Sequence, residues 1–168
     1  RIYKAYHMCD RLSHDFYVAD LLSDILAEGN SSRLILELVK NQQLFSDANA
    51  YHMDSFDNGL FIVTGSLLDG VTMEQAEHAI DEQLLRMCNE KVTEKELQKV
   101  KNKNESGIVF SEMSVLNKAM SLAFGELLGN ANMINEEIEK YARVTVDDIQ
   151  RVSKTIFTDT NCSTLYYN

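Results

Sequence analysis

The sequence has 168 residues, enough for one domain with its own core, and its 45% hydrophobic and 25% charged residues exclude a disordered chain. A formal net charge of −10 argues against binding to nucleic acid or to an anionic membrane surface, because both require a basic face. No apolar run approaches the roughly 20 residues that a helix needs to cross a bilayer, so we expect no membrane span.

The first part of the chain predicts a strand followed by two helices. Residues 1–8 alternate in a way that favours a strand, and apolar residues recur at helical spacing over residues 14–28 until a glycine stops the helix. A Gly-Asn-Ser-Ser turn then begins a short helix in which Leu34 and Leu38 face inward. We expect one of the two serine hydroxyls of this turn to cap that helix.

The next segment predicts a β-hairpin. Residues 46–53 alternate weakly, and residues 59–68 are rich in β-branched and aromatic side chains. The intervening segment, Asp54–Gly59, contains Asp-Asn-Gly, which is a strong turn signal. We therefore expect two antiparallel strands joined by this turn.

Three later helices begin with one shared pattern. In each, a Val precedes a Thr that caps the helix, and a Gln, Glu or Asp three residues after the Thr closes or approximates a capping box. The preceding Val is placed to pack against the fourth helical residue as a hydrophobic staple. The caps are Thr72, Thr93 and Thr145, which predict helices over residues 73–89, 94–111 and 146–157.

Apolar spacing predicts two more helices, over Val115–Leu128 and Met133–Tyr141, and the chain closes with a strand over Cys162–Tyr167. The aromatic character of that strand places it inside the sheet or against a helix. The apolar stripe of the first of these helices is made of Leu116, Ala119, Met120, Ala123, Phe124 and Leu127.

The predicted order is strand, two helices, hairpin, five helices, strand. Because helices occur in runs and do not alternate with strands, this order indicates an α+β fold with helices layered on a mainly antiparallel sheet. No proline or Ser/Gly-rich linker divides the chain, so residues 1–168 form a single domain. The abrupt start on Arg-Ile-Tyr-Lys, without Met or signal peptide, is what a fragment or a mature piece would show, and it leaves the compartment open.

The chain offers no self-contained active site. The nearest approach to a metal motif is Glu74, Glu77 and His78, which share one helix face, although such a set is more often a solvated acidic face. Three widely spaced cysteines fit neither a disulfide framework nor a zinc ribbon. GxSxG and glycine-rich phosphate loops are absent. We therefore predict no catalytic residue and no metal ligand in this chain.

Several motifs together resemble a known family, the pitrilysin/insulinase-type zinc peptidases. Their order and spacing, more than any single one, carry the resemblance over nearly the whole chain. The chain is most similar to the carboxy-terminal, non-catalytic domain of the bacterial two-domain branch, which is related to mitochondrial processing peptidase. The motifs are Gly29-x-Ser31-Ser32-Arg33-Leu34, the Leu44 region, Tyr51 before a hairpin ending Gly59-Leu60-Phe61, Val92-Thr93-x-x-Glu96-Leu97-x-x-Val100-Lys101, and Val144-Thr145-x-x-Asp148-Ile149-x-x-Val152.

The resemblance implies a mitochondrial-processing-peptidase-like domain that works with a separate HxxEH domain. In that family the first domain holds zinc through HxxEH and the motif Glu activates water, while the second domain closes the opposite wall of a chamber for an extended peptide. Zinc is therefore expected in the first domain of the parent protein and not in this chain. Many members carry an Arg and a Tyr that grip the substrate, and alignment on Leu44 puts Val39 and Ser46 at those positions here.

The leading hypothesis is a non-catalytic domain of a zinc metalloendopeptidase that contacts an HxxEH domain of the same polypeptide or of a partner subunit, with a peptide as substrate. A structural or assembly subunit that resembles the respiratory-complex core proteins is the alternative, and an HxxEH upstream of Arg1 would discriminate between the two. A free-standing module for basic peptides is a third possibility, supported by net charge alone. A bacterial source would make the location cytoplasmic or periplasmic.

Overall fold

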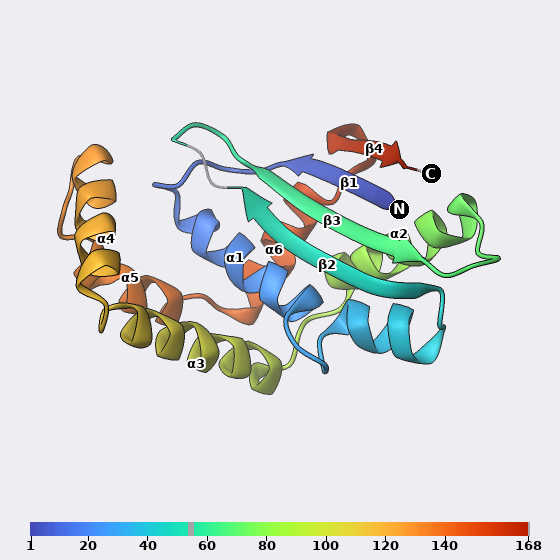
Figure 1. Ribbon diagram of the computed structural model, residues 1–168, viewed down its shortest axis with the longest axis horizontal. Helices are drawn as coiled ribbons and strands as arrows, with labels where there is room; N and C mark the ends of the chain where they lie inside the picture. The colour runs from blue at the N-terminus through green and yellow to red at the C-terminus, as the bar shows by residue number, and fades with distance from the viewer. Residues whose placement is uncertain (54–55, 168) are drawn as a thin grey trace.

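A four-stranded antiparallel sheet organises the structure, a computed structural model that describes residues 1–53 and 56–167 (Figure 1). The strand order is β2-β3-β1-β4, so the predicted hairpin pairs β2 with β3 and the two ends of the chain pair as β1 and β4. Of the predicted turn between β2 and β3, Asp54 and Ser55 lie outside the described residues. The strands are β1 (Ile2–His7), β2 (Phe45–Met53), β3 (Leu60–Leu67) and β4 (Cys162–Tyr166).

The helices pack on one face of this sheet, as the predicted α+β layering requires (Figure 1). Strand residues alternate between the two faces, and one alternate set, which includes Ile2, Tyr6 and Val63, joins the helices in a common core. The helical elements are α1 (His14–Ala27), η1 (Ile35–Asn41), α2 (Met73–Asn89), α3 (Glu94–Ser111), α4 (Val115–Leu127), α5 (Met133–Ala142), α6 (Val146–Ile156) and η2 (Asp159–Asn161).

The three predicted capping boxes are confirmed. Thr72, Thr93 and Thr145 each accept a hydrogen bond from the third helical N–H, and the side chain of that third residue accepts one from the Thr N–H. The valines before Thr93 and Thr145 are buried, as hydrophobic staples require. Local sequence therefore correctly predicts where these helices begin.

One expectation was wrong and two are made more specific. The predicted short helix is present as η1, and it is a π-helix, in which the Gln42 N–H bonds to the Glu37 carbonyl five residues back at 2.9 Å. No serine side chain caps it, because the Ser32 hydroxyl donates to the Gly29 carbonyl at 2.7 Å. Of the two alternatives for β4, the second is confirmed: the strand lies at an edge of the sheet, with β1 as its partner among the described strands, and its Thr164 and Tyr166 hydroxyls donate to Glu77 of α2.

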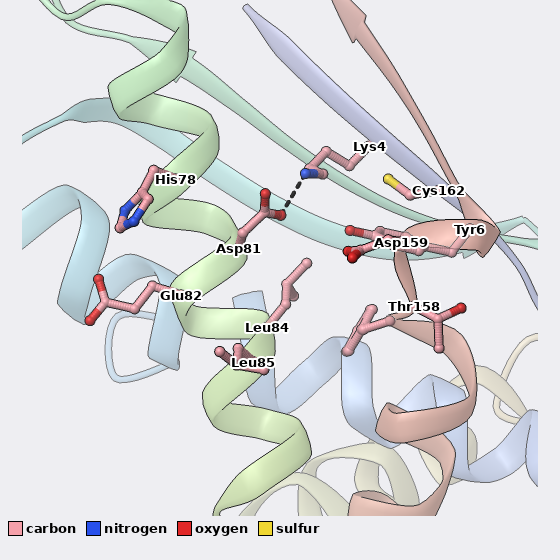
Figure 2. Close-up of a pocket in the computed structure, with 11 residues that line it drawn as sticks. Lys4, Tyr6, His78, Asp81, Glu82, Leu84, Leu85, Thr158, Asp159 and Cys162 are labelled. Atoms are coloured by element: carbon pink, nitrogen blue, oxygen red, sulfur yellow. Dashed lines mark hydrogen bonds and ion pairs between the residues drawn. The ribbon is translucent and has the colours of Figure 1, made fainter.

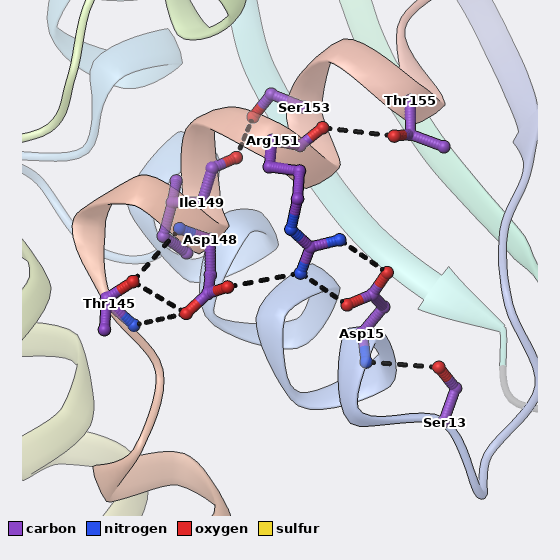
Figure 3. A network of polar contacts seen from close by, with 8 residues as sticks. All are labelled: Ser13, Asp15, Thr145, Asp148, Ile149, Arg151, Ser153 and Thr155. Carbon is purple, nitrogen blue, oxygen red and sulfur yellow. Dashed lines mark hydrogen bonds and ion pairs between the residues drawn. The ribbon is translucent and has the colours of Figure 1, made fainter.

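The N-terminus of α6 is tied to α1 by one arginine (Figure 3). The guanidinium of Arg151 donates to both carboxylate oxygens of Asp15, at 2.9 and 2.7 Å, and to Asp148 at 3.2 Å. The hydrogen bonds from Arg151 hold the pKa of Asp15 below its usual value. Because Asp148 also closes the capping box with Thr145, the same network fixes the start of α6 and its docking on α1.

We expect Arg151→Ala to lower the free energy of unfolding by about 1 kcal/mol, the upper range for a bidentate pair at the surface. Urea denaturation measures this change. The matched control is Arg143→Ala. This substitution removes only an exposed ion pair between the C-cap residue of α5 and Glu139, four residues earlier in that helix, and should change the free energy of unfolding by roughly 0.3 kcal/mol. Equal effects for the two variants would contradict a docking role for Arg151.

Candidate functional site

The two positions where the resembled family places its substrate-gripping pair lie on either side of a tight bend. Val39 sits in η1, partly buried against the core, whereas Ser46 is exposed on β2. Between them Gln43 has φ = 53°, a left-handed conformation that ends the helix as a glycine often does. That these positions face a peptide stays a prediction.

A β-bulge occurs at Ser46 itself. Phe45 pairs with Leu67 and Asp47 pairs with Ser66, so Ser46 has no partner of its own on β3. Its hydroxyl donates to the Ser66 carbonyl at 3.2 Å. Bulges redirect a side chain and occur often beside functional sites. In the described part of the sheet β2 is an outer strand, so this bulge lies on an edge of the sheet.

The motif residues that carry the family resemblance contact one another. Arg33 donates to the two carboxylate oxygens of Glu96 at 3.1 and 3.2 Å, which joins the Ser-Ser-Arg-Leu turn to the capping box of α3. Burial alone would raise the pKa of Glu96, but its bonds from Arg33 and Thr93 outweigh burial and lower the pKa. Lys101 donates to the Val144 carbonyl and so joins α3 to the segment before α6. These motif residues therefore link secondary-structure elements by hydrogen bonds and ion pairs, and they do not form a reactive centre.

A buried lysine lies between the sheet and α2 (Figure 2). Alternation along β1 turns Lys4 toward the helices, where its ammonium donates to Asp81 and, at 3.1 Å, to Glu77. Burial opposes the charge of Lys4, but the two carboxylates outweigh burial and raise its pKa. Lys4 is therefore held protonated and is a poor nucleophile. It lines a cavity of about 400 Å³ together with His78 and Asp81.

The acidic helix face singled out in the sequence is used for packing. Glu77 accepts hydrogen bonds from Lys4 and from the Tyr166 hydroxyl, and the Tyr166 bond is the main reason that its pKa is lowered. His78 points away from Lys4 in Figure 2. Across residues 1–53 and 56–167 no three His, Cys, Asp or Glu side chains gather closely enough to hold a metal ion. The residues present thus do not offer a zinc site.

A partly buried polar network that no sequence motif indicated lies under the sheet. The carboxylate of Asp20 in α1 accepts from His52 of β2 at 2.9 Å, from Asn104 of α3 at 3.2 Å and from the Tyr141 hydroxyl of α5. Burial alone would raise the pKa of Asp20, but the bonds from His52 and Tyr141 outweigh burial and leave it below its usual value. Four elements therefore converge on one carboxylate, which makes it a structural anchor.

Two of the cysteine side chains have raised thiol pKa values. Burial raises the pKa of both Cys9 and Cys88, so these thiols stay protonated at neutral pH and are poor nucleophiles.

Among the described residues no helix is long and apolar enough to span a membrane.

Comparison with known proteins gives a consistent result. The chain is 26% identical over 152 residues to the zinc protease PqqE of Helicobacter pylori, a match that covers 90% of this chain and 34% of that protein. It is 24% identical over 140 residues to YmxG of Bacillus subtilis, described as an uncharacterized zinc protease, which covers 83% of this chain and 34% of that protein. The chain thus spans about a third of the length of the curated relatives it matches.

A solved structure shows the same fold. The inactive peptidase domain from Bordetella parapertussis superposes with a TM-score of 0.91 at 22% identity, covering 99% of this chain and 91% of that one. The family model described as the peptidase M16 inactive domain matches residues 1–104. With that match across more than half of its length, the chain belongs to the peptidase M16 inactive domain family.

Proposed function

We propose that this chain is the non-catalytic domain of a zinc metallopeptidase, that it forms one wall of a peptide-binding chamber, and that it contacts the HxxEH domain that holds the zinc. The observation that carries the proposal is the family match in a chain whose sequence has no HxxEH. Both curated relatives are described as zinc proteases, which favours a peptidase parent over a purely structural subunit.

The face of the sheet opposite the helices suits a chamber wall. Strand residues that point away from the core include Tyr51, Met53 and Leu165, which are 39%, 53% and 61% exposed. Between the outer strands, Ile62 and Thr64 are nearly inaccessible, so the middle of this face is closely covered by its neighbours. A surface of aromatic and aliphatic side chains beside the bulged β2 edge fits an extended peptide.

The role of this chain in the reaction is positioning. The zinc of the HxxEH domain would supply the activated water, and the described residues of this chain form no cluster of three or more metal-ligating side chains. The backbone of β2 and the side chains of the open face would hold the peptide extended. The net charge of −10 would favour basic segments in the peptide as it enters.

The test compares the purified chain with the parent protein. We expect the chain alone to bind no stoichiometric zinc, measured by atomic absorption, and to hydrolyse no peptide in a fluorescent peptide library. The parent protein, with any partner subunit, should cleave peptides in a way that a chelator abolishes. Replacing the Glu of HxxEH with Gln is the matched control for contaminating protease. Chelator-sensitive cleavage by the chain alone would contradict the proposal.

A further inference from the structure

An exposed apolar surface covers the far end of the helical layer. We call it the α4 face and define it by Phe110, Met113, Leu116, Met120, Phe124 and Leu127. Of these, Met113, Phe110, Leu127 and Leu116 are 77%, 71%, 72% and 67% exposed. Large apolar patches of this kind on a folded domain mark interaction sites, whereas single exposed residues are ordinary.

The α4 face is the predicted apolar stripe of α4 continued from the end of α3. In Figure 1 α4 stands at one end of the molecule, away from the sheet, with α5 beside it. The stripe therefore has the period of a buried helix face but receives little cover from this domain. The helix is well formed, since the Ser114 side chain caps it by accepting from the Asn117 N–H.

A groove of about 500 Å³ runs along this face between α4 and α5. Met120, Phe124 and Leu127 line one side, and Met133 and Ile134 line the other. Methionine side chains adapt their shape readily, which suits a surface that receives a partner.

An ion pair underlies the same groove. Arg11 stacks over the Phe16 ring at 4.1 Å and forms an ion pair with Glu137 of α5, which holds the inner wall in place. The centroids of the Phe56 and Phe124 rings lie 5.7 Å apart, which is the spacing of an aromatic pair. The groove is therefore a preformed feature of the fold.

The charge of this surface specifies an apolar partner. Within residues 107–128 the charged side chains are Glu112, Lys118 and Glu126, and the first two form an ion pair at 3.8 Å. A basic peptide or a nucleic acid would find no opposite charge concentrated here, although the chain as a whole has a net charge of −10. The partner must instead bring apolar side chains of its own.

We infer that the α4 face is the docking surface for the HxxEH domain of the same protein. This inference rests on the proposed function and adds where the two domains meet. The curated relatives extend to roughly three times the length of this chain, so in them the aligned domain is joined to further chain that could cover such a surface. The exposed residues Leu12, Leu36 and Leu85 lie in separate parts of the chain: a turn, η1 and α2.

Thiol labelling tests the inference in the parent protein. Leu127→Cys places a reporter in the α4 face, and Leu85→Cys places one at a similarly exposed site on α2, beside the cavity that Lys4 lines. Labelling of each variant with a maleimide is timed in the isolated 168-residue chain and in the parent protein with any partner subunit. The native cysteines provide the baseline in both.

We expect the thiol at position 127 to react about tenfold or more slowly in the parent than in the isolated chain, with no such change at position 85. A photoreactive cross-linker on the position-127 thiol should then attach to the HxxEH domain. Equal labelling in the two proteins, or cross-links to a second copy of this chain, would overturn the inference. Chelator-sensitive cleavage by the same parent preparation is measured separately, so a failure of the proposed function is distinguished from a wrong docking surface.

Discussion

Replacing Asp20 with alanine should lower the free energy of unfolding by roughly 2–4 kcal/mol. The substitution removes the acceptor shared by His52, Asn104 and Tyr141, so three hydrogen bonds are lost, one of them from the buried Tyr141 hydroxyl. Because these donors come from β2, α3 and α5, the loss also loosens the docking of three elements on α1. Chemical denaturation followed by circular dichroism measures the change.

The control is Asp24, one helical turn further along α1. Burial is the main reason that the pKa of Asp24 rises to about 6, and Lys103 at 3.7 Å offsets that effect only in part. Its ionisation therefore costs stability at neutral pH. We expect Asp24→Asn to raise the free energy of unfolding by about 1 kcal/mol at pH 7.5, opposite in sign to Asp20→Ala.

The two aspartates should also respond oppositely to pH. Asp20 has a lowered folded-state pKa, so its contribution is present above the unfolded-state pKa and is lost as pH falls through the folded value. Asp24 has a raised pKa, so its favourable contribution is present at low pH and is lost as pH rises through about 6. Stability of the wild type and both variants measured from about pH 2 to 8, which covers the titration of both carboxylates, checks this. Parallel curves for all three proteins would contradict the assignment.

Adding a single methyl group at Gly65 should destabilise the fold by roughly 2–3 kcal/mol. A Cβ on Gly65 of β3 would lie 2.5 and 2.6 Å from two carbons of the Phe45 ring, which is 1% exposed and held in the core. Elsewhere the same change helps: Gly107 in α3 has open space around its Cα, so Gly107→Ala should stabilise by about 0.5–1 kcal/mol.

A double-mutant cycle identifies the cause. In a Phe45→Leu background the shorter side chain leaves room for a methyl group, so Gly65→Ala should cost at least about 1 kcal/mol less than in the wild type. Urea denaturation of the four proteins supplies the coupling energy. Simple additivity of the two substitutions would show that contact with Phe45 is not what requires glycine.

Much of the fold follows from local patterns. The Thr caps start α2, α3 and α6 where the sequence predicts them, because a capping box satisfies backbone groups with side chains only three residues away. The hairpin follows from β-branched alternation around a turn signal. The π-helical form of η1 could not be predicted from the sequence, because the spacing of its apolar residues Leu34 and Leu38 is equally compatible with an α-helix.

The candidate site was harder to predict from the sequence than the fold. Alignment on a motif placed Val39 and Ser46, but the bulge at Ser46 depends on the register between β2 and β3. The Asp20 network joins residues up to 121 positions apart, and no spacing rule relates such distant residues. The apolar stripe of α4 was visible in the sequence, yet a periodic pattern does not say whether the same domain covers it.

By itself, the sequence determined the order of the elements, the helix starts, the α+β class and the absence of HxxEH, because each depends on neighbouring residues. Tertiary structure alone decided that Arg33 meets Glu96, that β4 lies at an edge of the sheet and that the α4 face is left open. Those features arise from contacts between residues far apart in the chain, where the balance of burial, hydrogen bonding and charge is set only once the elements have packed.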